Sequence, residues 1–557
     1  MNFQMKHFTK KVELRNNPET VIRYHEETKH HFHRYARSLG YLDWANQPNP
    51  FRFYEGVNPV RFPFAKNDPD AAYMDLYERT RNQTKDFSFE NLSLFLELSL
   101  GVSAWKSIPG AKWALRINPS SGNLHPTESY VVLFSKNNSD PGIFHYSPFL
   151  HVLEPRANLP DELCQRLRAH FHTDGFLFAL TSIYWREAWK YGERAFRYCN
   201  HDIGHAIASA SFAANLFGWK ICYLNEVSDD TITRILGFHK TSWAAQEEEH
   251  PEILCFIHPY KAKETPKNLS SIIIDEISGL PFLGQPNQLS DAHVDWEIIS
   301  EVSRETVNPG MKSDDNIYTQ RPFLNSPESI LSAAQIIRQR RSAVAFDGMT
   351  SISKEEFFTM IDRTLPRKDC VPFDFGLGPV RVHLLLFVHR VRGLESGLYM
   401  FCRQDEHLEE LKSACLPRFR WQQVERDFPL YLLEEGSLMH EAVSVSCSQA
   451  IAGDSAFSVG MIAKFQESVL EAPHLYRHLF WETGMIGQVL YLGAEAHGVR
   501  STGIGCFLDD SVHEIMGLRD NQFQSLYHFT VGGPVEDDRL QTLPPYFHLT
   551  GRSDKNT

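Results

Sequence analysis

The sequence lacks any long apolar run: nowhere do about 18 uncharged apolar residues, the length that a membrane-spanning helix needs, follow one another. The N-terminal stretch has basic residues but no apolar segment of the secretory type. Basic residues are in the minority, with 56 Lys and Arg against 69 Asp and Glu and a net charge of −13. This balance argues against a broad surface for nucleic acid. We therefore expect a cytoplasmic protein without nucleic-acid or membrane partners.

Common signatures of metal and nucleotide chemistry are missing as well. The nine cysteines are scattered and never spaced as C-x-x-C, which disfavours a disulfide framework and a cysteine zinc site, so we expect small core residues. Without G-x-G-x-x-G after a strand, Walker A or G-x-S-x-G, a Rossmann domain, an NTPase and an α/β-hydrolase are disfavoured. His201 and His205 have the spacing of helical zinc ligands, but Asp202 replaces the expected Glu and no third ligand is evident. We predict no metal, and a zinc hydrolase is the least favoured alternative.

At 557 residues with 42% hydrophobic content, the chain is long enough for more than one core. Two stretches, 196–219 and 476–499, resemble each other at a constant offset of 280 residues. The offset places Gly204 on Gly484, with apolar and small residues at helical spacing around both. We predict two long buried helices whose small residues let another helix approach closely.

The internal resemblance continues on both sides of these helices. Each is followed by a short strand, an acidic helix start and an apolar strand, and each is preceded by a predicted hairpin, at 130–147 and 383–401. We therefore predict an α+β fold of two α/β sandwich halves, packed as an internal pseudo-dimer around the long helices. The predicted halves are 20–258 and 328–548, and 259–327 is a connector that lies along the surface.

Three polar stretches could carry chemistry, although each has a plainer interpretation. A turn-forming loop before an apolar strand offers hydroxyls and an amide to an anion or a ring carbonyl, and by itself it is more simply a turn. Arginines with a serine after a helical run suit a terminal phosphate, or equally a solvated helix end. An adjacent Lys and Tyr could exchange protons in a buried setting. These residues are, in order, Pro119, Ser120, Ser121, Gly122 and Asn123; Arg340, Arg341 and Ser342; Lys190 and Tyr191.

Taken together, the three stretches resemble a known family. They read R-x-N-P-S-S-G-N-L-H-P-T-E-x-Y at 116–130, K-Y-G-E-R-A-F-R-Y with D-I-G-H at 190–205, and R-R-S-x-x-x-F at 340–346. This set is similar to the FMN-dependent nitroreductase superfamily, and within it to the SagB-type dehydrogenases of thiazole/oxazole-forming peptide maturation. The resemblance implies an intimate dimer around a long helix, with FMN in the interface. It implies that Arg-Arg-Ser of one subunit holds the phosphate and the Pro-Ser loop of the other lies at the ring.

In a tandem member of that family, the resemblance implies one FMN per chain. The first half has the loop, but residues 78–87, where Arg-Arg-Ser is expected, do not contain that sequence. The second half has Arg-Arg-Ser, but residues 370–382, which precede its hairpin, contain neither Ser nor Asn. One pairing of loop and arginines is therefore complete and the other is degenerate. By the same resemblance, Ile504 and Gly505 lie near the isoalloxazine ring and Arg539 adds to the phosphate site.

The resemblance implies an FMN-dependent oxidoreductase in which Lys190 and Tyr191 remove a proton from the substrate while hydride passes to the flavin. We predict dehydrogenation of a SagB-type substrate, a small molecule or a peptide-derived heterocycle. Two alternatives stay open: a nitro or quinone reductase that uses NAD(P)H, and a non-catalytic flavin-binding or scaffold protein. Because the pseudo-dimer forms within one chain, the protein can be a monomer.

Overall fold

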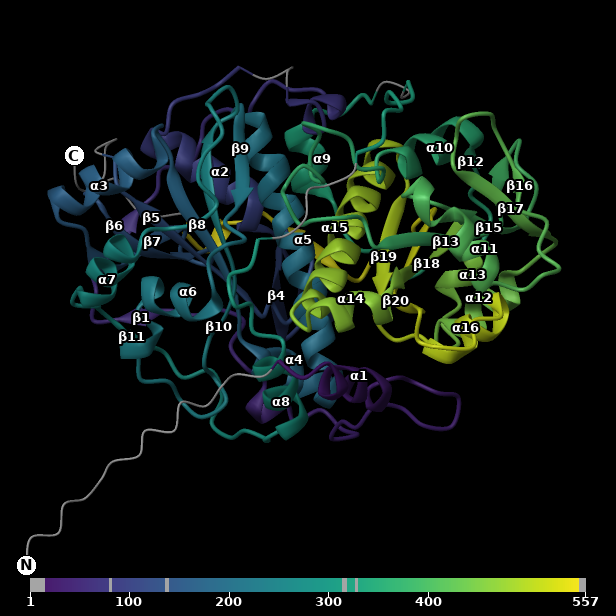
Figure 1. Cartoon of the computed structure of the whole chain (residues 1–557), viewed down its shortest axis with the longest axis horizontal. Coiled ribbons are helices and arrows are strands. Elements are labelled where there is room, and N and C mark those ends of the chain that lie inside the picture. The colour runs from purple at the N-terminus through teal and green to yellow at the C-terminus, as the bar shows by residue number, and fades with distance from the viewer. Residues whose placement is uncertain (1–15, 80–82, 136–139, 313–317, 326–328, 550–557) are drawn as a thin grey trace, which may run out of the picture.

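The computed structural model describes residues 16–79, 83–135, 140–312, 318–325 and 329–549. Its main features are two seven-stranded sheets, one from each half of the chain, with two long helices between them (Figure 1). Neighbouring strands within each of these sheets run antiparallel. Each half of the chain thus builds a sheet of its own.

The first sheet contains the first predicted hairpin at its centre. Val131 lies opposite Phe178 on the next strand, and both side chains are buried, as expected for a strand covered on both faces. The strand order is β2 (Val60–Arg61), β7 (Val152–Asn158), β6 (Gly142–Ser147), β5 (Thr127–Leu133), β8 (Phe176–Ser182), β10 (His250–Pro259) and β9 (Trp219–Tyr223).

The second sheet repeats this plan with the second predicted hairpin. Leu386 lies opposite Val459, and both are again fully buried. The strand order is β16 (Gln422–Gln423), β17 (Leu430–Glu435), β15 (Gly397–Phe401), β13 (Val382–Val388), β18 (Phe457–Lys464), β20 (Phe523–Gly532) and β19 (Arg500–Ile504).

Smaller strands and the helices cover these two sheets. One small sheet joins β21 (Gln541–Leu543), β3 (Val102–Ile108) and β4 (Ala111–Arg116), and two pairs join β1 (Tyr54–Glu55) to β11 (Gln285–Pro286) and β12 (Ile352–Ser353) to β14 (Val391–Arg392). The helices of the first half and of the segment after it are α1 (Pro18–Glu27), α2 (Phe89–Leu100), α3 (Asp161–Phe171), α4 (Tyr184–Tyr191), α5 (Ala195–Leu216), α6 (Asp229–Leu236), α7 (Ser271–Gly279) and α8 (Glu297–Glu305). Those of the second half are α9 (Ala333–Gln339), α10 (Lys354–Asp362), α11 (Leu408–Ala414), α12 (Met439–Val445), α13 (Ile451–Asp454), α14 (Phe465–Glu471), α15 (Leu475–Ala496) and α16 (Asp509–Met516).

The long helices α5 and α15 pack against each other at two glycines. A Cβ atom added to Gly204 would lie 2.2 Å from the carbonyl oxygen of Trp481 and 2.8 Å from the Cα atom of Gly484. A Cβ atom on Gly484 would lie 2.2 Å from the carbonyl oxygen of His201. These distances leave no room for a side chain at either position. The predicted close packing of two glycine-bearing helices is confirmed.

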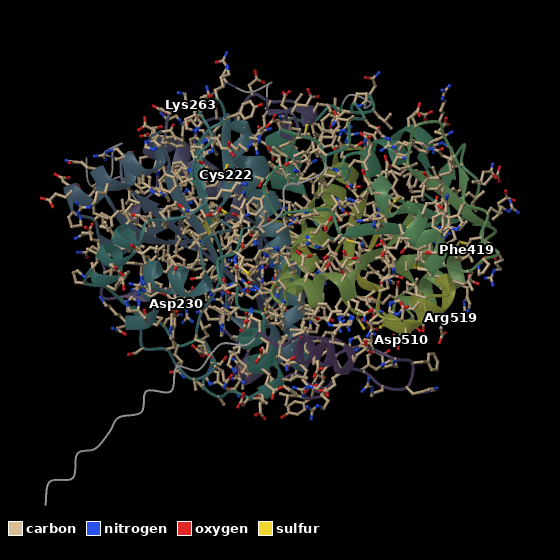
Figure 2. The ribbon with its side chains drawn as sticks, viewed as in Figure 1. Cys222, Asp230, Lys263, Phe419, Asp510 and Arg519 are labelled. Carbon is tan, nitrogen blue, oxygen red and sulfur yellow. The ribbon has the colours of Figure 1, made fainter. Side chains whose placement is uncertain are left out.

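The two ends of the described chain each pack on the opposite half. The backbone N–H of His30 donates to Asp509 at 2.9 Å, and Lys29 forms an ion pair with Asp510 at 3.1 Å. Figure 2 labels Asp510 at the lower edge of the second half, close to the N-terminal segment. At the other end, the backbone N–H of Val102 donates to the Tyr546 hydroxyl at 3.2 Å. Both ends therefore tie the halves together.

The predicted α+β architecture of two sandwich-like halves is confirmed. One apolar cluster includes α5, α15 and strands of both halves, while separate clusters lie under α3, α6 and α7 in the first half and under α11, α12 and α16 in the second. The boundaries 20–258, 259–327 and 328–548 stay predictions. No helix in the described ranges is long and apolar enough to cross a membrane.

Candidate active site between the two halves

A pocket of about 470 Å³ lies between the halves. Such a volume falls within the range of about 300–1,000 Å³ that is usual for small-molecule sites. Its walls come from the loop before β5, from α4 and α5, from the segment after α9, and from β19 with the loop that follows. The predicted site residues that line it are Pro119, Ser120, Ser121, Gly122, Asn123, Tyr191, Arg340, Arg341, Ser342, Ile504 and Gly505.

The loop before β5 turns through left-handed backbone conformations. The φ angle is 58° at Gly122 and 60° at Asn123, in the region that glycine and asparagine tolerate best. Asp202 of α5 anchors the turn, because its Oδ1 accepts from the Ser121 backbone N–H at 3.0 Å and from the Ser121 hydroxyl at 3.1 Å. The Asn123 side chain donates to the carbonyl oxygen of Ala114 at 2.9 Å. The polar side chains of the loop thus fix its shape against α5 and β4.

Two buried carboxyl groups lie behind this loop. The Glu187 Oε1 of α4 is 3.5 Å from the Ser120 hydroxyl oxygen, and Asp202 holds Ser121 as described above. Burial raises the pKa of Asp202 to about 7, although hydrogen bonds from Ser120 and Ser121 oppose the shift. Burial also raises the pKa of Glu187 well above its usual range, and the charge of Asp202 adds to the effect. Both groups can hold a proton near neutral pH, which equips the pocket for proton exchange.

Sequence reasoning missed both carboxyl groups as site residues. Glu187 and Asp202 stand on different helices, and neither belongs to a motif whose spacing indicates a shared loop. Asp202 falls within the matched D-I-G-H stretch, which was the available signal.

Lys190 and Tyr191 end α4 beside the same loop. A Cβ atom built on Gly122 would lie 2.6 Å from the Tyr191 hydroxyl oxygen and 3.2 Å from the Lys190 Nζ. The Tyr191 ring meets that of Tyr198 with centroids 4.6 Å apart. Burial raises the pKa of Tyr191 well above its usual range, so its hydroxyl keeps its proton. Tyr191 lines the pocket, whereas Lys190 packs against the loop without being one of the lining residues.

The arginines after α9 face the pocket without a carboxylate partner. Arg340 donates to the carbonyl oxygen of Arg116 at 3.0 Å, and its buried Nε makes no hydrogen bond. Arg341 donates to backbone carbonyl oxygens, and in the described part of the chain no ion pair joins either guanidinium to Asp or Glu. Burial lowers the pKa of Arg341 to about 10, and the charge of Arg340 lowers it further. Two adjacent, partly desolvated cations favour a bound anion here.

Further polar residues, which sequence reasoning did not single out, complete this end of the pocket. Lys106 of β3 and Arg500 of β19 line it, and Arg500 forms an ion pair with Glu536 at 2.5 Å. The Ser342 hydroxyl is 2.8 Å from that of Tyr491, over whose ring the Arg340 guanidinium lies. Single charged residues on separate strands give no signal in the sequence.

The structure does not bring Arg539 to the pocket. Its side chain is 86% exposed and pairs with Asp537 at 2.8 Å, in a turn after β20. Asp537 lines the pocket, but Arg539 does not. The family resemblance placed this residue at the phosphate site, whereas the direction of its side chain was not predictable.

The equivalent place on the other side of the pseudo-dimer is nearly closed. A cavity of about 100 Å³ is lined there by Tyr223 and His478, which the offset of 280 residues relates to Gly503 and Tyr198 of the large pocket. The Tyr223 ring stacks on that of Phe375 with centroids 5.6 Å apart. Aromatic side chains thus fill the space that the large pocket leaves open.

The two histidines with zinc-like spacing contact side chains of α15 across the interface between α5 and α15. His201 Nδ1 is 2.9 Å from the Thr483 hydroxyl, and His205 Nδ1 is 3.3 Å from the Gln488 side-chain oxygen. Within the ranges that the structure describes, no group of three or more His, Cys, Asp or Glu residues could hold a metal ion.

Comparison with known proteins relates the second half of the chain to a protein family. Residues 337–533 match the model of the nitroreductase family. The second half of the chain contains a nitroreductase family domain. No curated protein matches the chain.

The nitroreductase-like fold extends beyond this domain to the whole chain. A protein of Anabaena variabilis ATCC 29413, provisionally assigned as a nitroreductase, is 20% identical, with a TM-score of 0.66 over 93% of this chain and 99% of its own. A similarly assigned protein of Ralstonia eutropha JMP134 is 12% identical over 41% of this chain and 97% of its own, with a TM-score of 0.27. A chain of the E. coli microcin synthetase McbBCD complex, with truncated pro-MccB17 bound, is 18% identical over 44% of this chain and 95% of its own, with a TM-score of 0.26. The first of these similarities supports the fold of the whole chain.

Proposed function

We propose that the chain is an FMN-dependent oxidoreductase that binds one FMN in the pocket between its halves. The observation that carries the proposal is the pair Arg340 and Arg341, two guanidinium groups that line the pocket without a carboxylate partner. A phosphate monoester offers the acceptor oxygens that guanidinium groups bind. The nitroreductase family domain that contains these arginines supports flavin as the group that carries the phosphate.

The remaining residues fit the rest of that cofactor. Arg340, Arg341 and Ser342 would hold the phosphate, with Lys106 adding positive charge around it. The loop 119–123 and the segment Ile504–Gly505, which both line the pocket, would hold the ring system. FMN would supply hydride transfer, while the protein fixes its orientation and electrostatics.

The loop also supports a role for its neighbours in proton transfer. Lys190 and Tyr191 both contact the space around Gly122, and Glu187 lies behind Ser120. A base at this position would take a proton from the substrate as hydride leaves it. We therefore propose dehydrogenation of a SagB-type substrate, with Lys190 as base and the protonated Tyr191 hydroxyl as a hydrogen-bond donor.

The narrow second cavity supports a single site. Arg79 lies in the stretch 78–87, where Arg-Arg-Ser is expected in the first half, and residues 80–82 of this stretch lie outside the described residues. Its guanidinium makes a two-point ion pair with Asp374, so its charge is already neutralised. We accordingly propose that the second pairing binds no FMN.

The test is an absorption spectrum of the purified chain with the flavin-to-protein ratio, followed by a donor and acceptor screen. We expect one FMN per chain and reduction of that flavin by the substrate. A chain that stays colourless and takes up no FMN would refute the proposal, and two flavins per chain would refute the single site. Rapid flavin reduction by NAD(P)H, with turnover of nitro or quinone acceptors, would identify a reductase. Bound FMN without any turnover would identify a non-catalytic flavin protein.

A further inference from the structure

Two cysteines lie next to each other at the pocket, and one of them lines its wall. The sulfur atoms of Cys447 and Cys506 are 2.7 Å apart, and both residues are only partly buried free thiols. Cys506 follows Gly505 and lines the pocket, whereas Cys447 stands behind it after α12. The expectation that the cysteines are core residues is therefore wrong for this pair.

The backbone holds the two sulfurs in this position. The Leu508 N–H donates to the carbonyl oxygen of Val445 at 2.7 Å, which joins the loop after β19 to the end of α12. The Gln449 side chain donates to the carbonyl oxygen of Cys506 at 3.1 Å. Because the loops are joined on both sides of the pair, a disulfide, whose S–S bond is about 2.05 Å, would need only a small approach of the sulfurs.

The surroundings distinguish the two thiols. His30 Nδ1 accepts from the Ala36 N–H at 3.0 Å, so the proton of the neutral ring is on Nε2, which can donate to Cys506. A hydrogen bond from Cys447 and then the one from His30 lower the pKa of Cys506. The Arg194 guanidinium donates to the carbonyl oxygen of Gly505 at 3.2 Å, which keeps positive charge beside the same sulfur. These donors stabilise a thiolate on Cys506 rather than on Cys447.

We propose that Cys506 and Cys447 form a thiol–disulfide exchange site for low-molecular-weight disulfides that enter the pocket. The Cys506 thiolate attacks one sulfur of the disulfide R–S–S–R, forming Cys506–S–S–R and releasing RS⁻. Cys447 then loses its proton and attacks the Cys506 sulfur, which closes the Cys447–Cys506 bond and releases a second RS⁻. The small disulfide gains two electrons and becomes two thiols, while the protein dithiol loses them.

This step uses neither FMN nor the substrate of the proposed dehydrogenation, so it stands or falls separately from the proposed function. Three features carry it together: the sulfur contact, the access of Cys506 to the pocket, and the donors around its sulfur. Cys222 provides a contrast, because its partly exposed thiol also contacts a histidine, His258, at 3.2 Å, but burial raises the pKa of Cys222.

The experiment treats the reduced full-length chain with bis(2-hydroxyethyl) disulfide and follows the loss of free thiols. We expect two thiols per chain to disappear in a fast phase, with stoichiometric release of 2-mercaptoethanol. Tryptic digestion without reductant should join the peptides 427–464 and 501–519, which contain Cys447 and Cys506. The Cys447→Ser variant should stop at the mixed disulfide on Cys506, and Cys506→Ser should lose the fast phase.

Controls separate this site from general thiol oxidation. The Cys222→Ser variant should react like the unchanged chain, because it leaves the pair intact. A fast phase that persists in Cys506→Ser, or a cross-link of Cys506 to another cysteine, would overturn the proposal. Equal reactivity of Cys506 and Cys222 in the unchanged chain would also overturn it, and that comparison needs no variant to fold.

Discussion

Arg79 and Asp374 form a buried two-point ion pair across the interface of the two halves, with Arg79 Nη2 2.9 Å from Asp374 Oδ1. Arg79 also donates to the carbonyl oxygen of Trp219 at 2.9 Å. Arg340, by contrast, has backbone carbonyl partners and an Nε that makes no hydrogen bond. Arg79 is therefore neutralised by a carboxylate partner, whereas Arg340 keeps its positive charge without one.

Replacing Arg340 with Gln should weaken FMN binding. A charge-assisted hydrogen bond contributes about 1.5–3 kcal/mol, so we expect the dissociation constant to rise roughly 10- to 100-fold. Fluorescence titration of apoprotein with FMN measures this change. Arg338→Gln is the matched control, because Arg338 is bound to Asp68 and Glu97 outside the pocket.

The counterpart variant addresses the closed site. Arg79→Gln should leave the affinity and the stoichiometry of FMN unchanged, while lowering stability because Asp374 loses its buried partner. Thermal unfolding measures the second effect. A fall in flavin content per folded chain after this substitution would show that Arg79 takes part in binding.

The loop before β5 leads to a prediction about Gly122. In Gly122→Ala the new Cβ would meet the Tyr191 hydroxyl and the Lys190 Nζ, so both groups must shift. A displacement of about 1 Å in a catalytic site can cost about 100-fold in rate. We expect turnover, measured with the best substrate from the screen, to fall by about this factor.

Gly110→Ala is the control for backbone strain. Gly110 also has a positive φ, 86°, but a Cβ atom there would meet nothing within 4 Å. Both variants should lose comparable stability in thermal unfolding, and Gly110→Ala should keep full turnover. Equal turnover in the two variants would argue against a role for the Gly122 contacts.

The sequence was most informative where local pattern and packing coincide. Gly204 and Gly484 share a repeat offset and helical neighbours, and small residues on a buried helix have few uses other than close packing, so the central contact was predictable. The hairpins at 130–147 and 383–401 were predictable for a similar reason, since apolar strands joined by turn residues pair locally.

What the sequence did not reveal depends on long-range contacts. The strand β21 adds to β3 from more than 400 positions away, and its three residues carry no alternating pattern. Glu187 and Asp202 become a carboxyl pair only when α4 and α5 fold against the loop. Cys447 and Cys506 likewise meet through two loops that share no motif.

Replacing Lys190 with Met should slow substrate oxidation while FMN stays bound. Loss of a general base costs typically about 100- to 10,000-fold in rate, and Met keeps the length of the side chain. Single-turnover reduction of the bound flavin measures the chemical step. Tyr191→Phe removes only a hydroxyl and should have a smaller effect. Flavin reduction at an unchanged rate in Lys190→Met would exclude this lysine as the base.

Replacing Asp202 with Asn should stabilise the apoprotein at alkaline pH. The folded-state pKa of about 7 lies above the ordinary value of 3.8, so the native state binds the proton more tightly than the unfolded state. Stability contributed by this group is therefore complete below pH 3.8, falls as the pH rises toward 7, and stays low above that. Asn does not titrate and escapes this loss.

The difference in unfolding free energy between Asp202→Asn and the unchanged chain should therefore grow with pH. From pH 4 to pH 8 we expect a relative gain for the variant on the order of 4 kcal/mol, given 1.36 kcal/mol for each unit of pKa shift. Urea unfolding of apoprotein at several pH values measures it. A difference that stays constant between pH 4 and pH 8 would mean that Asp202 is ionised throughout, and that the carboxyl pair behind the loop does not store a proton.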